Sequence, residues 1–289
     1  MFKNEYESAI AAVQSMLLEV SGNPKAGNVD REHDFEDLKY EHFIVSSVSS
    51  FPIFLNATFK RDSIGKLILE AVKTTSEWHK ATNVHFGAFL LLIPLLTVWN
   101  SKNIVEMAER ATDELKKTTH QDSIAIFRAF KLSSARVLDV EDLSLESNKT
   151  EEYLASNNIN VYEWMKLAPK ENLIAKELIN SYRISLKGCE MLLNFFEEFN
   201  DVNVAVVLCY HTLLSEYLDP LIISKSKIDV AELVRNDAKS CLEEFEKEQN
   251  VQVFKRLDEE LIRKKLNPGT IADLTISSIY FALAEGWRF

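Results

Sequence analysis

The sequence contains little glycine, proline or cysteine. Its 289 residues include 7 Gly, 6 Pro and 3 Cys. An odd number of widely spaced cysteines, set in apolar helical patterns, argues against a disulfide framework and indicates reduced thiols in the core. Few windows show the polar–apolar alternation of half-buried strands, so the scarcity of Gly and Pro favours helices. Composition therefore predicts an all-α protein.

Positive charge is also scarce. The chain has 33 Lys and Arg against 44 Asp and Glu, a net charge of -11. Nucleic acids and anionic membranes require clustered cations, so we expect neither as a partner. The longest apolar run, residues 88–99, contains Pro94 and is too short to span a bilayer. Lys3, Glu5 and Glu7 interrupt any signal peptide, and a cytoplasmic protein is expected.

Apolar residues recur at helical spacing through most of the chain. Tyr6, Ile10 and Val13 begin a stripe that predicts a first helix ending near Ser21. Further helices are predicted over residues 43–54, 64–78, 86–99, 104–115, 123–132, 161–165, 171–199, 202–218, 230–248, 251–265 and 270–285. With 46% apolar residues and no repeat, one compact helical domain over residues 1–289 is expected. Residues 134–160, rich in Asp, Glu, Ser and Asn, are expected to form an exposed loop or lid.

A polar segment follows the first predicted helix. Lys25 and Arg31 flank Gly27, where a ligand could approach the backbone closely, and the acids Asp34 and Asp37 come soon after. Cations that meet phosphate oxygens, together with one or two carboxylates that hold Mg²⁺, suit a nucleoside triphosphate. A polar surface loop between helices would have the same composition, and that interpretation stays open.

Asn83, His85 and Gly87 open the most apolar predicted helix. Polar side chains beside the free N–H groups of a helix start can bind an anion, and Gly87 allows close approach. Alternatively, Asn83 caps the helix and His85 fills a half-buried site.

The last predicted helix begins after the turn Asn267-Pro268-Gly269. Thr270 could cap this helix, with Asp273 three residues on, in a near capping box. Alternatively, Gly269 and the first N–H groups of the helix contact phosphate, with Asp273 beside the metal.

No common nucleotide-binding or metal motif is present. The chain has no Walker loop, no GxGxxG after a strand, no GxSxG and no HExxH. An enzymatic site would therefore be assembled from separated helices. Glu177, His211 and Asp219 are either satisfied core residues or point into a shared cavity.

Taken in order, these segments resemble the triphosphoribosyl-dephospho-CoA synthase family of all-helical transferases. The matching segments are Glu19-Val20-Ser21 with Pro24-Lys25 and residues 27–30, His33-Asp34, Gly65 with Glu70, Asn83 with His85 and Gly87, and residues 268–274. Two departures stand out: the family's Lys-Pro-Gly is Lys25-Ala26-Gly27 here, and its Asn-Thr-His-Lys-Gly has Val84 and Phe86 at the second and fourth positions. The middle of the chain is closer to an archaeal or C1-metabolism branch.

The resemblance implies an ATP-dependent pentosyl transferase that joins the ribose C1 of ATP to the 2′-hydroxyl of dephospho-CoA and releases adenine. The substrate-binding residues that it implies are Lys25, Gly27, Arg31, Asn83, His85, Gly87, Gly269 and Thr270. It further implies Mg²⁺ at Asp34 and Asp37, and Glu70 or Asp273 as the base or charge stabiliser. The rival hypotheses are a related transferase with another acceptor or phosphorylated donor, and an inactive helical interaction scaffold.

Trp287 and Phe289 lie at the C-terminus, where they could seal a core or form a subunit contact. A homodimer is therefore a further prediction.

Overall fold

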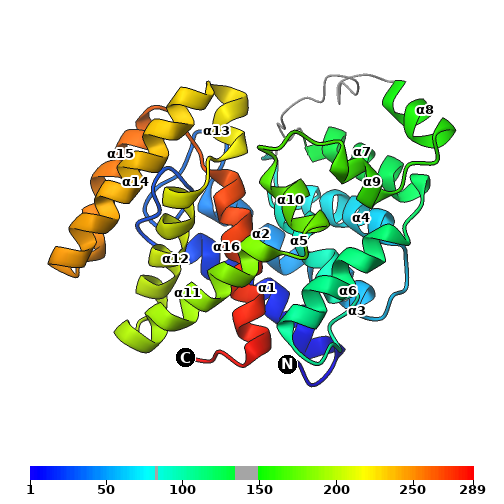
Figure 1. The fold of residues 1–289 in the computed structure, drawn as a ribbon, viewed down its shortest axis with the longest axis horizontal. Coiled ribbons are helices and arrows are strands. Elements are labelled where there is room, and N and C mark those ends of the chain that lie inside the picture. Colours follow the sequence, from blue (N-terminus) through cyan, green and yellow to red (C-terminus); the bar gives the residue numbers. More distant parts are fainter. Residues whose placement is uncertain (82–83, 134–148) are drawn as a thin grey trace.

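The computed structural model describes residues 1–81, 84–133 and 149–289, and every regular element in these ranges is helical (Figure 1). The all-α prediction is confirmed for this part of the chain. The helices of the first half are α1 (Glu5–Ser21), α2 (Tyr40–Ser49), α3 (Phe51–Thr58), α4 (Ile64–Ser76), α5 (Phe86–Leu96), α6 (Ile104–Lys116) and α7 (His120–Ser133). They are followed by α8 (Lys149–Ser156), α9 (Val161–Lys166), α10 (Leu173–Ile179), α11 (Arg183–Phe199), α12 (Val202–Glu216), α13 (Pro220–Lys225), α14 (Ile228–Glu248), the 3₁₀ helix η1 (Val251–Phe254), α15 (Lys255–Arg263) and α16 (Gly269–Glu285).

Helix α16 runs through the centre of the molecule and contacts α1, α5, α11 and α12 (Figure 1). Nearly every residue from Ile271 to Ala284 is buried, including Ser277 and Ser278. A helix that is apolar on all sides belongs in a protein interior. The polar residues of its first turns, Thr270 and Asp273, are half-buried.

Most buried apolar side chains form one large cluster that includes Phe2 and Trp287, and a smaller cluster consists of Val207, Leu208, Phe245 and Phe254. Trp287 is 5% exposed and packs edge-on against Phe196, with ring centroids 5.4 Å apart. It therefore seals the core, which is one of its two predicted roles. Phe289 is 66% exposed, and the homodimer stays a prediction.

Two predicted helices are each divided in two. The segment 43–54 breaks at Ser50, because Pro52 occupies the first turn of the new helix α3. The segment 171–199 breaks at Ser181 and Tyr182, which adopt φ values of 55° and 54°. The apolar spacing continues across both breaks, so periodicity alone did not reveal them.

Further differences concern the connecting segments. Helix α13 was not predicted, and α8 forms at the end of the predicted loop 134–160. Residues 134–148 of that predicted loop lie outside the described residues. Among the described helices, none has the length and apolar character needed to cross a membrane.

Candidate active site

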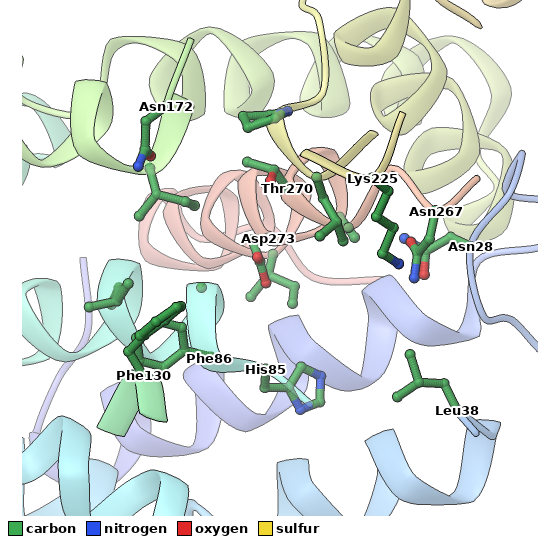
Figure 2. Close-up of a pocket in the computed structure, with 18 of the residues that line it drawn as sticks. Asn28, Leu38, His85, Phe86, Phe130, Asn172, Lys225, Asn267, Thr270 and Asp273 are labelled. Carbon is green, nitrogen blue, oxygen red and sulfur yellow. The ribbon is translucent and has the colours of Figure 1, made fainter. Parts of the chain in front are cut away.

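A cavity of about 850 Å³ opens where the starts of α5 and α16 meet the loop between α1 and α2 (Figure 2). One wall is apolar and includes Phe86, Phe130 and Trp164. Figure 2 places Lys225, Asn267 and Asn28 on the other side, with Asp273 and His85 between the two walls. The cavity therefore offers an aromatic wall and a polar wall on either side of a carboxyl group.

Asp273 stands on the first turns of α16 and lines this cavity. A Cβ added to Gly87 would lie 2.0 Å from Asp273 Oδ2, so only glycine leaves room for the carboxyl group at the start of α5. The Ala88 N–H donates a hydrogen bond to it. Loss of solvation, reinforced by the negative charges of Glu19 and Asp219, raises the pKa of Asp273 well above its usual value.

Glu19 is a second carboxyl group on the cavity, and it was not predicted as a site residue. It is 2% exposed and pairs with Lys25 Nζ, which is fully buried. Burial raises the pKa of Glu19, while the charge and hydrogen bond of Lys25 oppose this shift. Lys25 does not line the cavity, so it acts on the site through Glu19.

His85 lines the cavity from the residue before α5, with a left-handed backbone at φ 62°. Its Nδ1 lies 3.0 Å from Ser46 Oγ, its ring packs edge-on against Phe43, and its Nε2 has no hydrogen-bond partner. Burial lowers the pKa of His85 to about 3, so the imidazole is neutral at pH 7. It can exchange a hydrogen bond with a ligand, a phosphate oxygen included, but it supplies no positive charge at neutral pH.

Three lysines supply positive charge around the cavity, namely Lys225, Lys264 and Lys265. Sequence reasoning missed all three. Beside them lie two buried amides, whose Asn28 Nδ2 and Asn267 Oδ1 have no hydrogen-bond partner within the protein. Unpaired buried amide groups that face a cavity are suited to binding a polar ligand. Two of the three lysines could have been noticed in the sequence, because Lys264 and Lys265 stand directly before the turn of residues 266–269.

The start of α16 differs from its prediction. Gly269 and Thr270 line the cavity, but Pro268 is the N-cap and no side chain caps the helix. The predicted Thr270–Asp273 capping box is therefore wrong. Instead, Asp219 Oδ2 accepts the Ile271 N–H at 3.0 Å, and burial raises the pKa of Asp219 to about 6.

Asp219 is buried because it also caps α13: its Oδ1 accepts the Leu221 and Ile222 N–H groups. The Thr270 N–H donates to the same side chain. These amides of α16 are thus occupied within the protein, which argues against the predicted phosphate contact at this helix start.

Glu177 and His211 likewise have partners inside the protein. Glu177 accepts the Ile184 and Ser185 N–H groups at the start of α11, at 2.8 Å each. His211 Nε2 accepts the Ala26 N–H, and its ring stacks on Phe254 with centroids 3.8 Å apart. Their role is to position helices and loops.

Several predicted residues do not reach the cavity. Gly27 adopts φ +71° and packs against the Leu266 carbonyl, where a Cβ would lie 2.5 Å from the oxygen. Glu70 pairs with Lys66 on the partly exposed side of α4. Arg31 is exposed and is absent from the cavity lining. These placements give Arg31 and Glu70 no contact with a ligand in the cavity.

The two predicted metal ligands differ in their surroundings. Asp37 lines the cavity, whereas Asp34 does not and its Oδ1 accepts the Tyr40 N–H at 2.8 Å. Asn83 lies outside the described residues.

The described residues form an all-helical fold whose cavity places a carboxyl group between an aromatic wall and a polar wall, an arrangement that suits a transferase. A family profile described as ATP:dephospho-CoA triphosphoribosyl transferase (CitG) matches residues 5–289. A relative from Streptococcus equi subsp. equi (strain 4047), named "Probable 2-(5''-triphosphoribosyl)-3'-dephosphocoenzyme-A synthase", is 24% identical over 306 residues and 95% of each chain is covered.

A crystal structure from Archaeoglobus fulgidus, described as a candidate triphosphoribosyl-dephospho-CoA synthase, has a similar fold with a TM-score of 0.70. It is 43% identical, and the match covers 84% of this chain and 99% of the other. The chain therefore belongs to the ATP:dephospho-CoA triphosphoribosyl transferase family.

Proposed function

We propose that the cavity binds ATP and transfers its triphosphoribosyl group to the 2′-hydroxyl of dephospho-CoA. The observation that supports this proposal most directly is the order of groups across the cavity. An aromatic wall, a carboxyl group and a polar wall that includes Lys225 follow one another, as the adenine, ribose and triphosphate follow one another in ATP (Figure 2).

The lysine-rich side is suited to the triphosphate. Lys225, Lys264 and Lys265 can meet phosphate oxygens, and the unpaired Asn28 and Asn267 amide groups can complete the contact. Lys264 is paired with Glu260 and Lys265 with Glu36, both at exposed positions, so these ion pairs exchange for phosphate at little cost.

The aromatic side is suited to the base. Phe86 and Phe130 stand with ring centroids 6.1 Å apart, and Trp164 adds a third ring to this wall. Aromatic side chains offer large apolar faces on which a purine can stack.

Asp273 then lies where the glycosidic bond must break. In the reaction, the C1–nitrogen bond to adenine breaks, the 2′-oxygen bonds to C1, and one proton passes from the hydroxyl to adenine. While ionised, the Asp273 carboxylate stabilises the oxocarbenium-like centre with its negative charge. Its raised pKa makes it a stronger base for the hydroxyl proton, which it then passes to the departing adenine. Glu19, held by Lys25, places a second carboxyl group on the same cavity.

The purified chain, incubated with ATP, Mg²⁺ and dephospho-CoA, should release adenine and form a product whose mass equals that of both substrates less adenine. Asp273→Asn keeps the size of the side chain but removes the base, and it should lower kcat by about 10²–10⁴-fold. If the folded wild-type protein releases no adenine, ATP and dephospho-CoA are not its substrates.

The lysine assignment has its own matched control. Lys264→Met and Lys265→Met should raise KM for ATP, whereas Lys227→Met should not, because Lys227 is exposed and outside the cavity lining. An equal effect of all three substitutions would show general charge attraction rather than a phosphate site.

The proposed reaction includes Mg²⁺ bound to ATP. Of the predicted ligands, Asp37 lines the cavity, whereas Asp34 does not and accepts the Tyr40 N–H. We expect Mg²⁺ to enter on the triphosphate of ATP. Adenine release titrated against EDTA and then Mg²⁺ measures this requirement, and full activity in excess chelator would contradict it. We also propose that the protein acts in the cytoplasm, where ATP is abundant.

A further inference from the structure

Three potential metal ligands gather beneath the loop between α1 and α2, away from the cavity lining. They are Asp30 and His33 of the loop and Asp258 of α15. One oxygen or nitrogen atom from each lies within 4.8 Å of the other two. Asp30 and His33 are three residues apart, whereas Asp258 comes from the far end of the chain, so only the fold assembles this cluster.

Backbone N–H groups hold both carboxylates in place. Asp30 Oδ1 accepts the N–H groups of Glu32 and His33 at 2.8 and 2.9 Å, and its Oδ2 accepts the Lys25 N–H at 3.1 Å. Asp258 Oδ1 accepts the Gly27 N–H at 2.9 Å. The two carboxylates are therefore oriented before any ion binds.

The second oxygen of Asp258 points into the cluster. Asp258 is fully buried, and its Oδ2 makes no regular hydrogen bond but faces His33 Nδ1 at ion-pair distance. His33 Nδ1 is itself without a regular hydrogen bond. The two atoms thus face each other on the same side of the cluster, and their only partner is one another, so both can turn to an ion that binds there.

The charge of the cluster also favours a cation. Asp30 is 1% exposed and Asp258 is fully buried, so two carboxylates face each other away from water. The nearby Lys25 ammonium is paired with Glu19. A buried pair of carboxylates repels itself unless a positive charge lies between them, and a divalent ion supplies that charge.

We propose that Asp30, His33 and Asp258 bind a divalent transition-metal ion of the Zn²⁺ or Mn²⁺ type. An imidazole nitrogen with two carboxylate oxygens suits these ions better than Mg²⁺ or Ca²⁺, which prefer oxygen ligands throughout. His33 is 24% exposed, which leaves room for water to complete the coordination.

The ion fastens the loop to α15. The same loop carries Asn28 and Asp37 to the cavity, and Lys264 and Lys265 follow α15 directly. Metal binding therefore orders two segments of the substrate site without contacting the substrate.

Metal binding is tested on the full-length protein, stripped with a chelator and dialysed into metal-free buffer. Calorimetric titration with Zn²⁺, Mn²⁺ and Mg²⁺, without substrates, should show about one Zn²⁺ or Mn²⁺ per chain and much weaker Mg²⁺ binding. Co²⁺ should give visible absorption bands typical of a mixed nitrogen and oxygen site.

His33→Ala should weaken Zn²⁺ binding at least tenfold and abolish the Co²⁺ bands. His120→Ala is the matched control, since His120 is a half-buried histidine that bonds Asn158 and lies outside the cluster, so the variant should bind as the wild type does. Asp258→Asn should also lose the ion, with circular dichroism to establish that it is folded.

The proposal is overturned if the wild-type protein binds none of the three ions, or if His33→Ala binds Zn²⁺ as tightly as His120→Ala does. Because no substrate is present, this outcome leaves the proposed transferase activity unaffected. Loss of adenine release in a protein that still binds Zn²⁺ would conversely affect only the proposed function.

Discussion

Gly87→Ala should impair catalysis, because the methyl group of alanine would push the Asp273 carboxyl group out of its position. The added Cβ would lie 2.0 Å from Asp273 Oδ2, well inside van der Waals contact. The backbone of Gly87 has no positive φ, so alanine itself is not strained there. The carboxyl group must move by about 1 Å or more, and misplacing a catalytic group by ~1 Å can cost about 100-fold in rate.

The expected loss of stability is smaller. Overpacking a core costs about 1–3 kcal/mol, and the higher helix propensity of alanine recovers up to about 1 kcal/mol. Initial rates of adenine release, with urea unfolding of the same sample, separate the two effects. The double variant Gly87→Ala with Asp273→Ala should regain stability without regaining activity, because the clash and the carboxyl group disappear together.

Gly188→Ala is the matched control. Its Cβ would meet Ser278 Oγ at 2.2 Å, between α11 and α16, and neither residue lines the cavity. We expect a similar loss of stability but adenine release within about threefold of the wild type, because surroundings remote from the site relax independently. Wild-type kcat in Gly87→Ala, or an equal loss of kcat in Gly188→Ala, would refute the role given to Asp273.

Three further predictions concern buried polar groups. Lys25→Met leaves Glu19 buried and unpaired, which should lower the free energy of unfolding in urea by about 3–5 kcal/mol. Adding Glu19→Gln should recover part of this loss. No recovery in the double variant would contradict the pairing of Lys25 with Glu19. The pKa of His85 is about 3 in the fold and 6.5 in the unfolded chain, so its contribution to stability is complete above pH 6.5 and declines as pH falls toward 3. At pH 5 the free energy of unfolding is lower by about 2 kcal/mol for this reason. The His85→Gln variant should therefore lose about 2 kcal/mol less than the wild type between pH 7 and pH 5. Parallel curves of unfolding free energy against pH for the two proteins would contradict the low pKa of His85. Asp219→Ala leaves the Ile271 N–H without its acceptor and should lower the free energy of unfolding by about 2 kcal/mol. It should also raise KM for ATP. An unchanged KM would show that Asp219 does not influence ATP binding in the cavity.

The sequence by itself determined most of the helices. Local spacing of apolar residues decides which segments bury one face, and this is why α4 and α6 were predicted nearly to their ends. The break at Ser181 and Tyr182 was not predictable in this way, because its left-handed backbone is stabilised by the contacts of Glu177 with the next helix.

The sequence also indicated the chemical character of the site in part. His85, Gly87, Gly269, Thr270 and Asp273 were singled out from helix starts and turns, and all of them line the cavity. Such positions carry a local signal, since a helix start or a tight turn restricts which residue types fit.

Only the tertiary structure decided which charged residues face the cavity. Arg31, Asp34 and Glu70 point elsewhere, while Glu19 and Lys225 line it. A charged side chain is compatible with either solvent or a cavity, and the direction it takes depends on how distant helices pack rather than on its neighbours in sequence. The same reason explains why Asp258 joins Asp30 and His33 only once the two ends of the chain have come together.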